Sequence, residues 1–278
     1  MALFFAVVVF LGWFLSYYYG NLAILIVAIV FSLIMNVASY WYSDKIVLKL
    51  SAARPFERRE SEELWDIVEN LSITSGLPMP KIYIIEDPAP NAFATGRNKE
   101  HAVVAVTAGL LKILNKTELE GVIAHELSHI GNRDILLSTI VVVLVGFVSI
   151  LSHIFLRSRM WGGGGRNRDN NVGAFLIIVG VIFTILSPII ATIIQLAISR
   201  KREFLADASG ALLTRYPEGL ANALVKISKY SAPMTHANNA TAHLFIANPF
   251  GAKAARGINK LFMTHPPVEE RIKALRQI

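Results

Sequence analysis

His125-Glu126-Leu127-Ser128-His129 lies near the middle of the 278-residue chain. On an α-helix, residues four positions apart project from the same face, so both imidazoles can reach one metal ion. Glu126, between them, can then take a proton from a water molecule that the ion activates. This pattern is typical of zinc metalloproteases, in which the histidines bind the metal and the glutamate is the general base.

The residues before this motif predict that it is helical. Thr117 and Glu120 have the spacing of a capping box, in which two side chains satisfy the first free N–H groups of a helix. We therefore expect a helix that begins near Glu118 and runs through both histidines. Gly131-Asn132 can either end this helix or loosen it before the apolar segment that follows.

A third metal ligand is expected farther along the chain. A catalytic zinc ion needs three protein ligands and one open position. Because the chain contains no cysteine, the ligands must come from His, Asp or Glu. Glu203 is the candidate that completes the set with His125 and His129, and together they would hold one Zn²⁺ ion. Asp207, one helical turn later, is expected to orient a histidine by hydrogen bonding. The alternative is that Glu203 belongs to a solvated charged turn.

The peptide oxygen that becomes negatively charged during hydrolysis also needs a hydrogen-bond donor. His265 and Arg271, close to the C-terminus, are the leading candidates. Either can instead be an ordinary surface residue. The other histidines have no metal-ligand spacing, and we interpret them as hydrogen-bonded or solvated side chains: His101, His153, His236 and His243.

Four apolar segments of the chain contain no charged residue. Asp, Glu, Lys and Arg are absent from residues 1–43, 135–156 and 170–199. The apolar segments are Ala2–Tyr19, 22–42, 135–155 and 171–199. At about 1.5 Å per residue, each approaches the roughly 30 Å of a hydrocarbon core. We expect four transmembrane helices in two hairpins. The alternatives are buried helices of a soluble protein or, for the second hairpin, incomplete crossing of the bilayer.

The basic residues predict the orientation in the membrane. Lys45, Lys49 and Arg54 follow the first hairpin closely, whereas its turn carries no charge. By the positive-inside rule, we expect the N-terminus and the region after residue 42 to be cytoplasmic. The chain would then be a multi-pass protein of the cell membrane. Anionic lipid headgroups account for the net charge of +7 better than nucleic acid does, so a lipid bilayer and no nucleic acid is expected as partner.

The remaining residues predict a mainly α fold with a small β-sheet. Residues 61–75 and 108–114 have helical patterns, and residues 81–86 and 101–107 have the β-branched composition of strands. We expect three parts: a transmembrane hairpin at 1–42, a cytoplasmic peptidase domain from 43–134 and 200–278, and a second hairpin at 135–199. The latter contains a glycine- and arginine-rich loop at 157–170.

Five segments together resemble the HtpX family of membrane-bound zinc metallopeptidases, which is related to the CAAX prenyl endopeptidases. They are NAFATG at 91–96, HELSH at 125–129, REFLAD at 202–207, ATAHLFI at 240–246 and THPPVEERI at 264–272. The resemblance covers nearly the whole chain. It implies an α+β zincin-like catalytic domain, with zinc held by the three ligands named above.

The resemblance also implies how substrates bind. His265 and Arg271 would approach the reaction centre. An edge strand would pair with an extended protein or peptide substrate, and its residues would be Asn91, Ala92, Phe93, Ala94 and Thr95. Family members with this arrangement act in the quality control of membrane proteins, which are therefore the expected substrates.

Two other classes of function compete with an endopeptidase. A metal transporter would place ionisable residues inside the apolar segments, but these contain only His153. An inactive metal-binding scaffold of the same fold would not need Glu126. The sequence therefore favours the enzyme.

Overall fold

The computed structural model describes residues 2–140, 200–238, 240–251 and 266–278. The chain divides into two compact units. One consists of Met1–Ser43 and Val143–Thr192, and the other of Asp44–Val142 and Ile193–Ile278. The predicted loop 157–170 and the whole of the fourth apolar segment lie outside the described residues.

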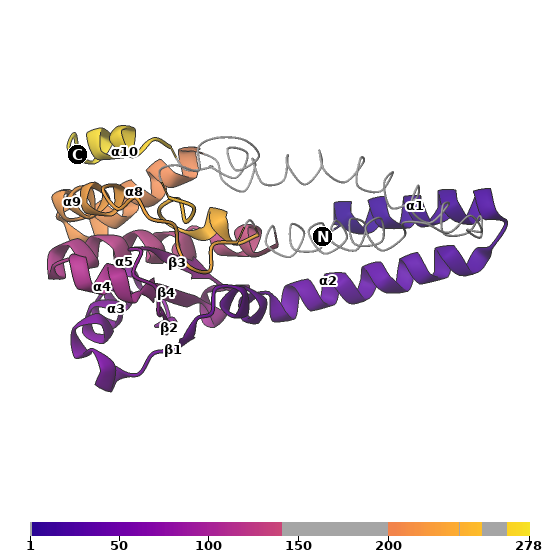
Figure 1. Cartoon of the computed structure of the whole chain (residues 1–278), viewed down its shortest axis with the longest axis horizontal. Helices are drawn as coiled ribbons and strands as arrows, with labels where there is room; N and C mark the ends of the chain where they lie inside the picture. The colour runs from indigo at the N-terminus through magenta and orange to yellow at the C-terminus, as the bar shows by residue number, and fades with distance from the viewer. Residues whose placement is uncertain (1, 141–199, 239, 252–265) are drawn as a thin grey trace, which may run out of the picture. The chain divides into compact units, whose positions relative to one another are not determined.

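The described part of the first unit consists of helix α1 (Ala2–Tyr19) and most of helix α2 (Leu22–Leu50), whose residues from Asp44 onward belong to the second unit (Figure 1). The helices that we expected at the first two apolar segments are therefore present. Gly20 lies between them at a φ of 62°, which a residue without a side chain adopts easily. The Asn21 side chain then accepts a hydrogen bond from Ala23 N at the start of α2.

The four predicted transmembrane helices are not confirmed. Within the described residues, no single helix is long and apolar enough to cross a membrane. The one combination there that meets the length and composition requirement is the pair Leu22–Ala38 and Tyr40–Leu50, which is bent by 68°. Of the third apolar segment, only residues 135–140 are described.

A four-stranded mixed sheet forms the β-part of the second unit (Figure 1). Its strands are β1 (Arg54–Pro55), β2 (Lys81–Ile85), β3 (Ala92–Thr95) and β4 (Val103–Thr107). In the order β1-β2-β4-β3, β2 and β4 are parallel and the outer pairs are antiparallel. The two predicted strands are confirmed as β2 and β4, and β3 lies at an edge as expected.

The helix between β1 and β2 begins and ends at local signals that the sequence predicted. In α3 (Glu62–Ser75), the Ser61 hydroxyl accepts a hydrogen bond from Leu64 N and thereby caps the first turn. Gly76 ends the helix in a left-handed conformation at φ 66°. The short helix α4 (Ala108–Ile113) follows β4, and short 3-10 turns η1 (Arg58–Glu60) and η2 (Lys99–His101) complete this region.

The central helix α5 (Lys116–Gly131) carries the motif and begins two residues earlier than predicted. Its capping box is formed by Asn115 and Glu118, whose side chains each bond the other's backbone N–H at 2.9–3.0 Å. The Thr117 and Glu120 box was therefore wrong, because Asn115 offers the same capping chemistry one half-turn earlier.

The described helices of the C-terminal half are α8 (Arg200–Thr214), α9 (Pro217–Ser228) and α10 (Val268–Leu275). Helices α8 and α9 pack against α5, and α10 packs against α8 and α9. Helix α5 contacts the sheet on one side and α8 and α9 on the other (Figure 1). Small residues allow this close packing. A Cβ atom added to Gly121 would lie 2.5 Å from Leu220 N, and one added to Gly210 would lie 3.0 Å from His125 N.

Candidate active site

The two histidines of α5 converge as the helical spacing predicts. Their Nε2 atoms lie 3.2 Å apart, and their rings are nearly perpendicular, with centroids 4.7 Å apart. His125 is fully buried, whereas His129 keeps 15% of its side chain exposed. The close approach of Gly210 to the His125 backbone brings α8 within reach of both rings.

Glu203 on α8 completes a cluster in which the three candidate ligand atoms lie within 4.8 Å of one another. One of its carboxylate oxygens lies 3.6 Å from His129 Nε2, and the other lies 3.8 Å from His125 Nε2. Two ligands of a tetrahedral zinc ion, with bonds of roughly 2.0–2.1 Å, are about 3.3 Å apart. Two imidazoles and one carboxylate at these separations fit a single zinc ion.

Asp207 holds His125 from behind, as its position one turn after Glu203 predicts. Its Oδ1 atom lies 3.0 Å from His125 Nδ1, which leaves Nε2 facing the other ligands. Burial raises the pKa of this carboxyl, but the Arg271 charge and the hydrogen bonds with His125 and Arg271 outweigh it and lower the pKa to about 2. Asp207 is therefore an ionised acceptor that favours the Nδ1–H tautomer of His125.

Arg271 reaches the site but contacts protein groups on every side. Its Nε and Nη2 atoms donate to the two oxygens of Asp207 at 2.9 and 2.7 Å, and Nη1 donates to Ile246 O at 3.4 Å. The guanidinium is fully buried, 3.4 Å from His125 Nε2 and 3.7 Å from a Glu203 oxygen. This placement supports the metal ligands rather than a substrate oxygen. His265 lies outside the described residues.

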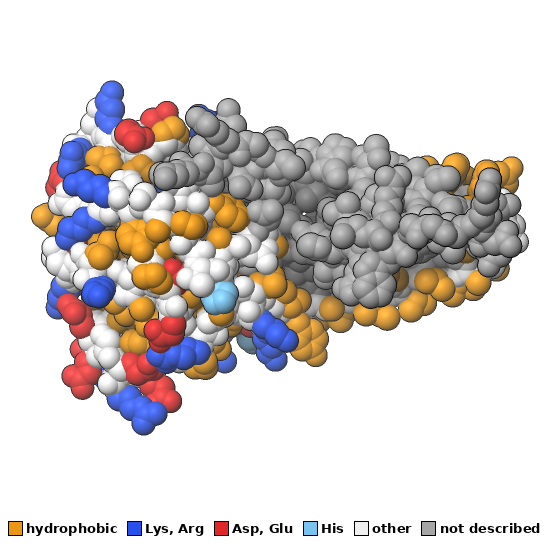
Figure 2. Space-filling view, viewed as in Figure 1, with side chains coloured by type: hydrophobic (Ala, Val, Ile, Leu, Met, Phe, Trp, Pro, Cys, Tyr) orange, Lys and Arg blue, Asp and Glu red, His pale blue; other side chains and the backbone are white. Residues whose placement is uncertain are grey.

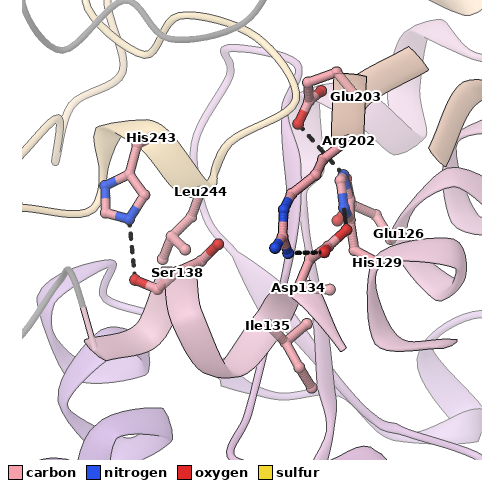
Figure 3. A pocket seen from close by; sticks show the side chains of 10 residues that line it. Glu126, His129, Asp134, Ile135, Ser138, Arg202, Glu203, His243 and Leu244 are labelled. Atoms are coloured by element: carbon pink, nitrogen blue, oxygen red, sulfur yellow. Dashed lines mark hydrogen bonds and ion pairs between the residues drawn. The ribbon is translucent and has the colours of Figure 1, made fainter. Parts of the chain in front are cut away.

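A second carboxylate, which was not predicted from the sequence, contacts the other ligand. Asp134 Oδ2 lies 3.0 Å from His129 Nδ1, and Arg202 binds the second oxygen of Asp134 (Figure 3). An acidic residue five positions after the second histidine was the only sequence signal. Asp134 can point toward His129 only if the helix ends between these two residues.

The two ligand histidines have opposite pKa shifts in the metal-free chain. Burial lowers the pKa of His125 to about 4, more than its contact with Asp207 raises it. Burial also lowers the pKa of His129, but the hydrogen bond with Asp134 and the charges of Glu203 and Glu126 outweigh it and raise the pKa to about 9. At neutral pH, a metal ion must therefore displace a proton from His129 but not from His125.

Glu126 lines the same cavity as two of the three candidate metal ligands (Figure 3). The cavity has a volume of about 30 Å³, and its lining includes His129, Glu203, Ala94 and His243. This space is enough for a water molecule. His243 is buried and its Nε2 atom lies 3.0 Å from Ser138 O, so the expected hydrogen-bonded histidine is confirmed, although at the cavity wall.

The edge strand β3 approaches this cavity at Ala94. In an antiparallel pair, alternate residues bond to the partner strand. Asn91 O accepts a hydrogen bond from the N–H of Thr107 in β4. Ala92 and Ala94 therefore direct their backbone N–H and C=O groups away from β4. Ala92 O accepts a hydrogen bond from Ile246 N at 3.0 Å, so this part of the strand edge is already paired. The part at Ala94 lies beside the cavity.

The neighbouring residues hold β3 in place. The Asn91 side chain bonds both the N–H and the C=O of Ala247, and the rings of Phe93 and Phe245 meet edge to face at 5.1 Å. Thr95 Oγ1 lies 3.1 Å from Thr139 Oγ1. All five predicted substrate-binding residues are thus at or next to this edge, and Ala94 alone of them lines the cavity.

Comparison with known proteins accords with this geometry. Residues 58–278 match the family described as peptidase family M48. The chain belongs to peptidase family M48. The resemblance to HtpX is confirmed as well, because curated relatives of this chain carry the name "Protease HtpX homolog". Membership of M48, together with the three-ligand cluster, supports a metalloprotease.

Two of these relatives align along most of the chain. The relative from Caldanaerobacter subterraneus subsp. tengcongensis is 47% identical over 277 residues, covering 99% of this chain and 90% of its own. The relative from Tropheryma whipplei is 50% identical over 240 residues, covering 86% and 80%. The fold resembles the crystal structure of Ste24p from S. mikatae, with a TM-score of 0.53 and 19% identity, over 97% of this chain and 62% of that one.

Proposed function

We propose that this M48 member is a zinc-dependent endopeptidase that is anchored in a membrane and cleaves extended segments of membrane proteins. The proposal rests on one observation: His129, Glu203 and Glu126 line the same cavity, and His125 lies next to His129 and Glu203. Three ligands and one buried acid at an open position are the parts that metal-assisted hydrolysis requires.

The zinc ion is proposed to bind to His125, His129 and Glu203. When bound, zinc acts as a Lewis acid that acidifies a water molecule and polarises the carbonyl of the peptide bond. Glu126 is the general base: its carboxylate accepts a proton from the attacking water and delivers it to the departing amine nitrogen. Burial of Glu126 beside the ligands keeps this carboxylate within reach of one reacting centre.

The two other predicted catalytic residues are assigned different roles. His265 remains our candidate for the donor that stabilises the negatively charged oxygen. Arg271, whose nitrogen atoms all have protein acceptors, is proposed to act on catalysis through Asp207 and His125. It fixes the ligand geometry and does not touch the substrate.

The substrate is proposed to bind as an additional strand along β3. The outward N–H and C=O of Ala94 would pair with the backbone of the substrate and present a peptide carbonyl at the cavity. Main-chain pairing depends little on side chains, so it suits cleavage of many sequences. Because Ile246 already bonds to Ala92, pairing is confined to the Ala94 end of the strand.

Membrane anchoring is supported by the side chains of α1 and α2. Many large apolar residues on these helices are exposed, among them Phe10, Trp13, Ile26, Val30 and Val37. Figure 2 shows hydrophobic side chains along α2, whereas charged side chains gather on the unit that carries the sheet. Exposed apolar surface of this extent is typical of membrane or protein–protein interfaces, and it supports burial in lipid. We propose a multi-pass protein of the cell membrane, with a cytoplasmic catalytic unit and a role in membrane-protein quality control.

The test is the isosteric substitution Glu126→Gln in protein purified in detergent. We expect this variant to bind zinc as the unchanged chain does, and to lose hydrolysis of casein or a membrane-protein substrate by about 10²-fold or more, because the amide cannot accept the proton. His125→Ala should lose both zinc and activity. Full activity of the Glu126→Gln variant would overturn the proposed mechanism.

A further inference from the structure

Each of the two ligand histidines is backed by an aspartate, and each aspartate is bound by an arginine. The first chain of contacts runs from His125 through Asp207 to Arg271. The second runs from His129 through Asp134 to Arg202, and Figure 3 shows dashed lines that link these side chains one to the next. Of these contacts, only the one between Asp207 and a histidine was expected from the sequence.

The backbone is bent at one residue to bring Asp134 to His129. Successive residues of an α-helix are rotated by about 100°, so a residue five positions on lies about 140° around the axis and faces away. Helix α5 instead ends at Gly131, and Arg133 adopts a left-handed φ of 62° before the chain becomes helical again at residue 134. This conformation is unfavourable for a residue with a side chain.

The strained turn is not required to end the helix, but it places Asp134 next to His129. It aims the Asp134 carboxylate back at His129 Nδ1, at 3.0 Å. Strained conformations of non-glycine residues concentrate at functional sites, where surrounding contacts hold them. A charged residue that merely starts a helix would be solvated, whereas Asp134 is 5% exposed.

Arg202 connects this turn to the other helix that bears a ligand. It lies on α8 immediately before Glu203, and it donates to the Asp134 oxygen that His129 leaves free. The segment after α5 and the first turn of α8 are thereby joined next to the metal ligands. Arg202 is partly exposed, with 39% of its side chain accessible, and contacts Asp134 through one nitrogen, whereas Arg271 is fully buried and bidentate.

We propose that Asp134 is a positioning residue of the metal centre, held by Arg202. It accepts the Nδ1 proton of His129 and keeps the ring turned so that Nε2 faces the ion. Arg202 fixes the carboxylate in the orientation that this bond requires, and so couples the placement of His129 to that of Glu203. This inference rests on the proposed function, because it concerns ligands of the proposed zinc ion.

The test measures zinc affinity, by competition with a chromophoric chelator, for the full chain in detergent. Loss of a partner behind a ligand histidine typically lowers metal affinity by about 10–100-fold, and we expect a loss in this range for Asp134→Asn. The visible spectrum of the Co²⁺-loaded variant should also shift, because a turned imidazole changes the ligand field. Asp66→Asn, which disrupts the exposed ion pair with Arg58, is the matched control and should change neither.

Arg202→Gln provides a second variant that leaves the aspartate in place. We expect a smaller loss of zinc affinity, and Lys201→Gln on the same exposed turn should have none. The double variant of Asp134→Asn and Arg202→Gln should lose less than the sum of the single losses, expressed as free energies, because the two residues act through one contact.

The outcomes separate this inference from the proposed function. If the unchanged chain binds no zinc, the proposed function fails and this inference fails with it. If the unchanged chain binds zinc, and Asp134→Asn binds it equally tightly with the same Co²⁺ spectrum, only the role of Asp134 is overturned. Additive losses in the double variant would overturn the role of Arg202.

Discussion

Asp207 and Arg271, 64 residues apart in the chain, form a bidentate pair with both side chains buried. Asp207 contacts the metal-ligand histidine of α5, and Arg271 comes from the C-terminal helix α10. The pair therefore attaches the last described helix to the candidate metal centre. The pKa of Arg271 is raised, because the attraction of Asp207 and Glu203 outweighs the effect of burial.

Removal of the Arg271 charge should destabilise the fold as well as the metal centre. Arg271→Gln leaves a buried carboxylate without its counter-charge, which typically costs about 3–5 kcal/mol of unfolding free energy. Denaturant unfolding in detergent measures this change. The control is Arg276→Gln, which removes an exposed pair with Glu218 at 3.5 Å and should cost at most about 1 kcal/mol. Equal losses for the two variants would contradict the structural role of Arg271.

Loss of the Glu203 carboxylate should remove zinc without unfolding the protein. Glu203→Ala leaves only the two imidazoles, and a two-ligand site holds zinc far more weakly than a three-ligand one. We expect the zinc content of purified protein to fall well below that of the unchanged chain, as measured by atomic emission. Glu218→Ala on α9 is the matched control at an exposed position. Unchanged zinc content in Glu203→Ala would remove this residue from the ligand set.

The metal-free protein should be most stable near pH 6.5, the ordinary pKa of histidine. The pKa of His125 is lowered to about 4, so between pH 4 and 6.5 the unfolded chain binds a proton that the folded chain excludes, and stability rises with pH. The pKa of His129 is raised to about 9, so between pH 6.5 and 9 the folded chain retains a proton that the unfolded chain releases, and stability falls.

Thermal unfolding of chelator-treated protein from pH 4 to 9 tests this profile. Saturation with zinc should abolish the fall above pH 6.5, because a zinc-bound imidazole has no proton to retain. His129→Gln should abolish it in the metal-free protein as well. A metal-free profile that still rises between pH 6.5 and 9 would show that the contacts of His129 do not favour its charged form.

The contact between α5 and α9 should tolerate no side chain at Gly121. A methyl group there would lie 2.5 Å from the Leu220 backbone, so Gly121→Ala must separate the helices, and overpacking of this kind typically costs about 1–3 kcal/mol. Gly131→Ala, on the same helix, meets only the Leu77 side chain at 3.8 Å and should be tolerated. Unfolding midpoints compare the two, and a stable Gly121→Ala protein would contradict the close packing.

Local signals in the sequence account for much of the catalytic unit. Ser61 and Gly76 delimit α3 through hydrogen bonds within a few residues, and β-branched runs mark β2 and β4. Where two capping residues compete within one turn, as Asn115 and Thr117 do before α5, the sequence does not rank them. The error moved the start of a helix but not the face that carries the histidines.

Residue spacing and donor chemistry were enough to predict the helical register of His125, Glu126 and His129 and the type of residue that had to complete their site. Which distant residues support these ligands depended instead on the packing of the folded chain. In the structure, Arg271 binds Asp207. A left-handed turn places Asp134 next to His129, and Arg202, 68 residues from Asp134, binds its carboxylate. Such contacts depend on how helices pack and where each one ends, and the periodicity of a single helix does not encode that packing.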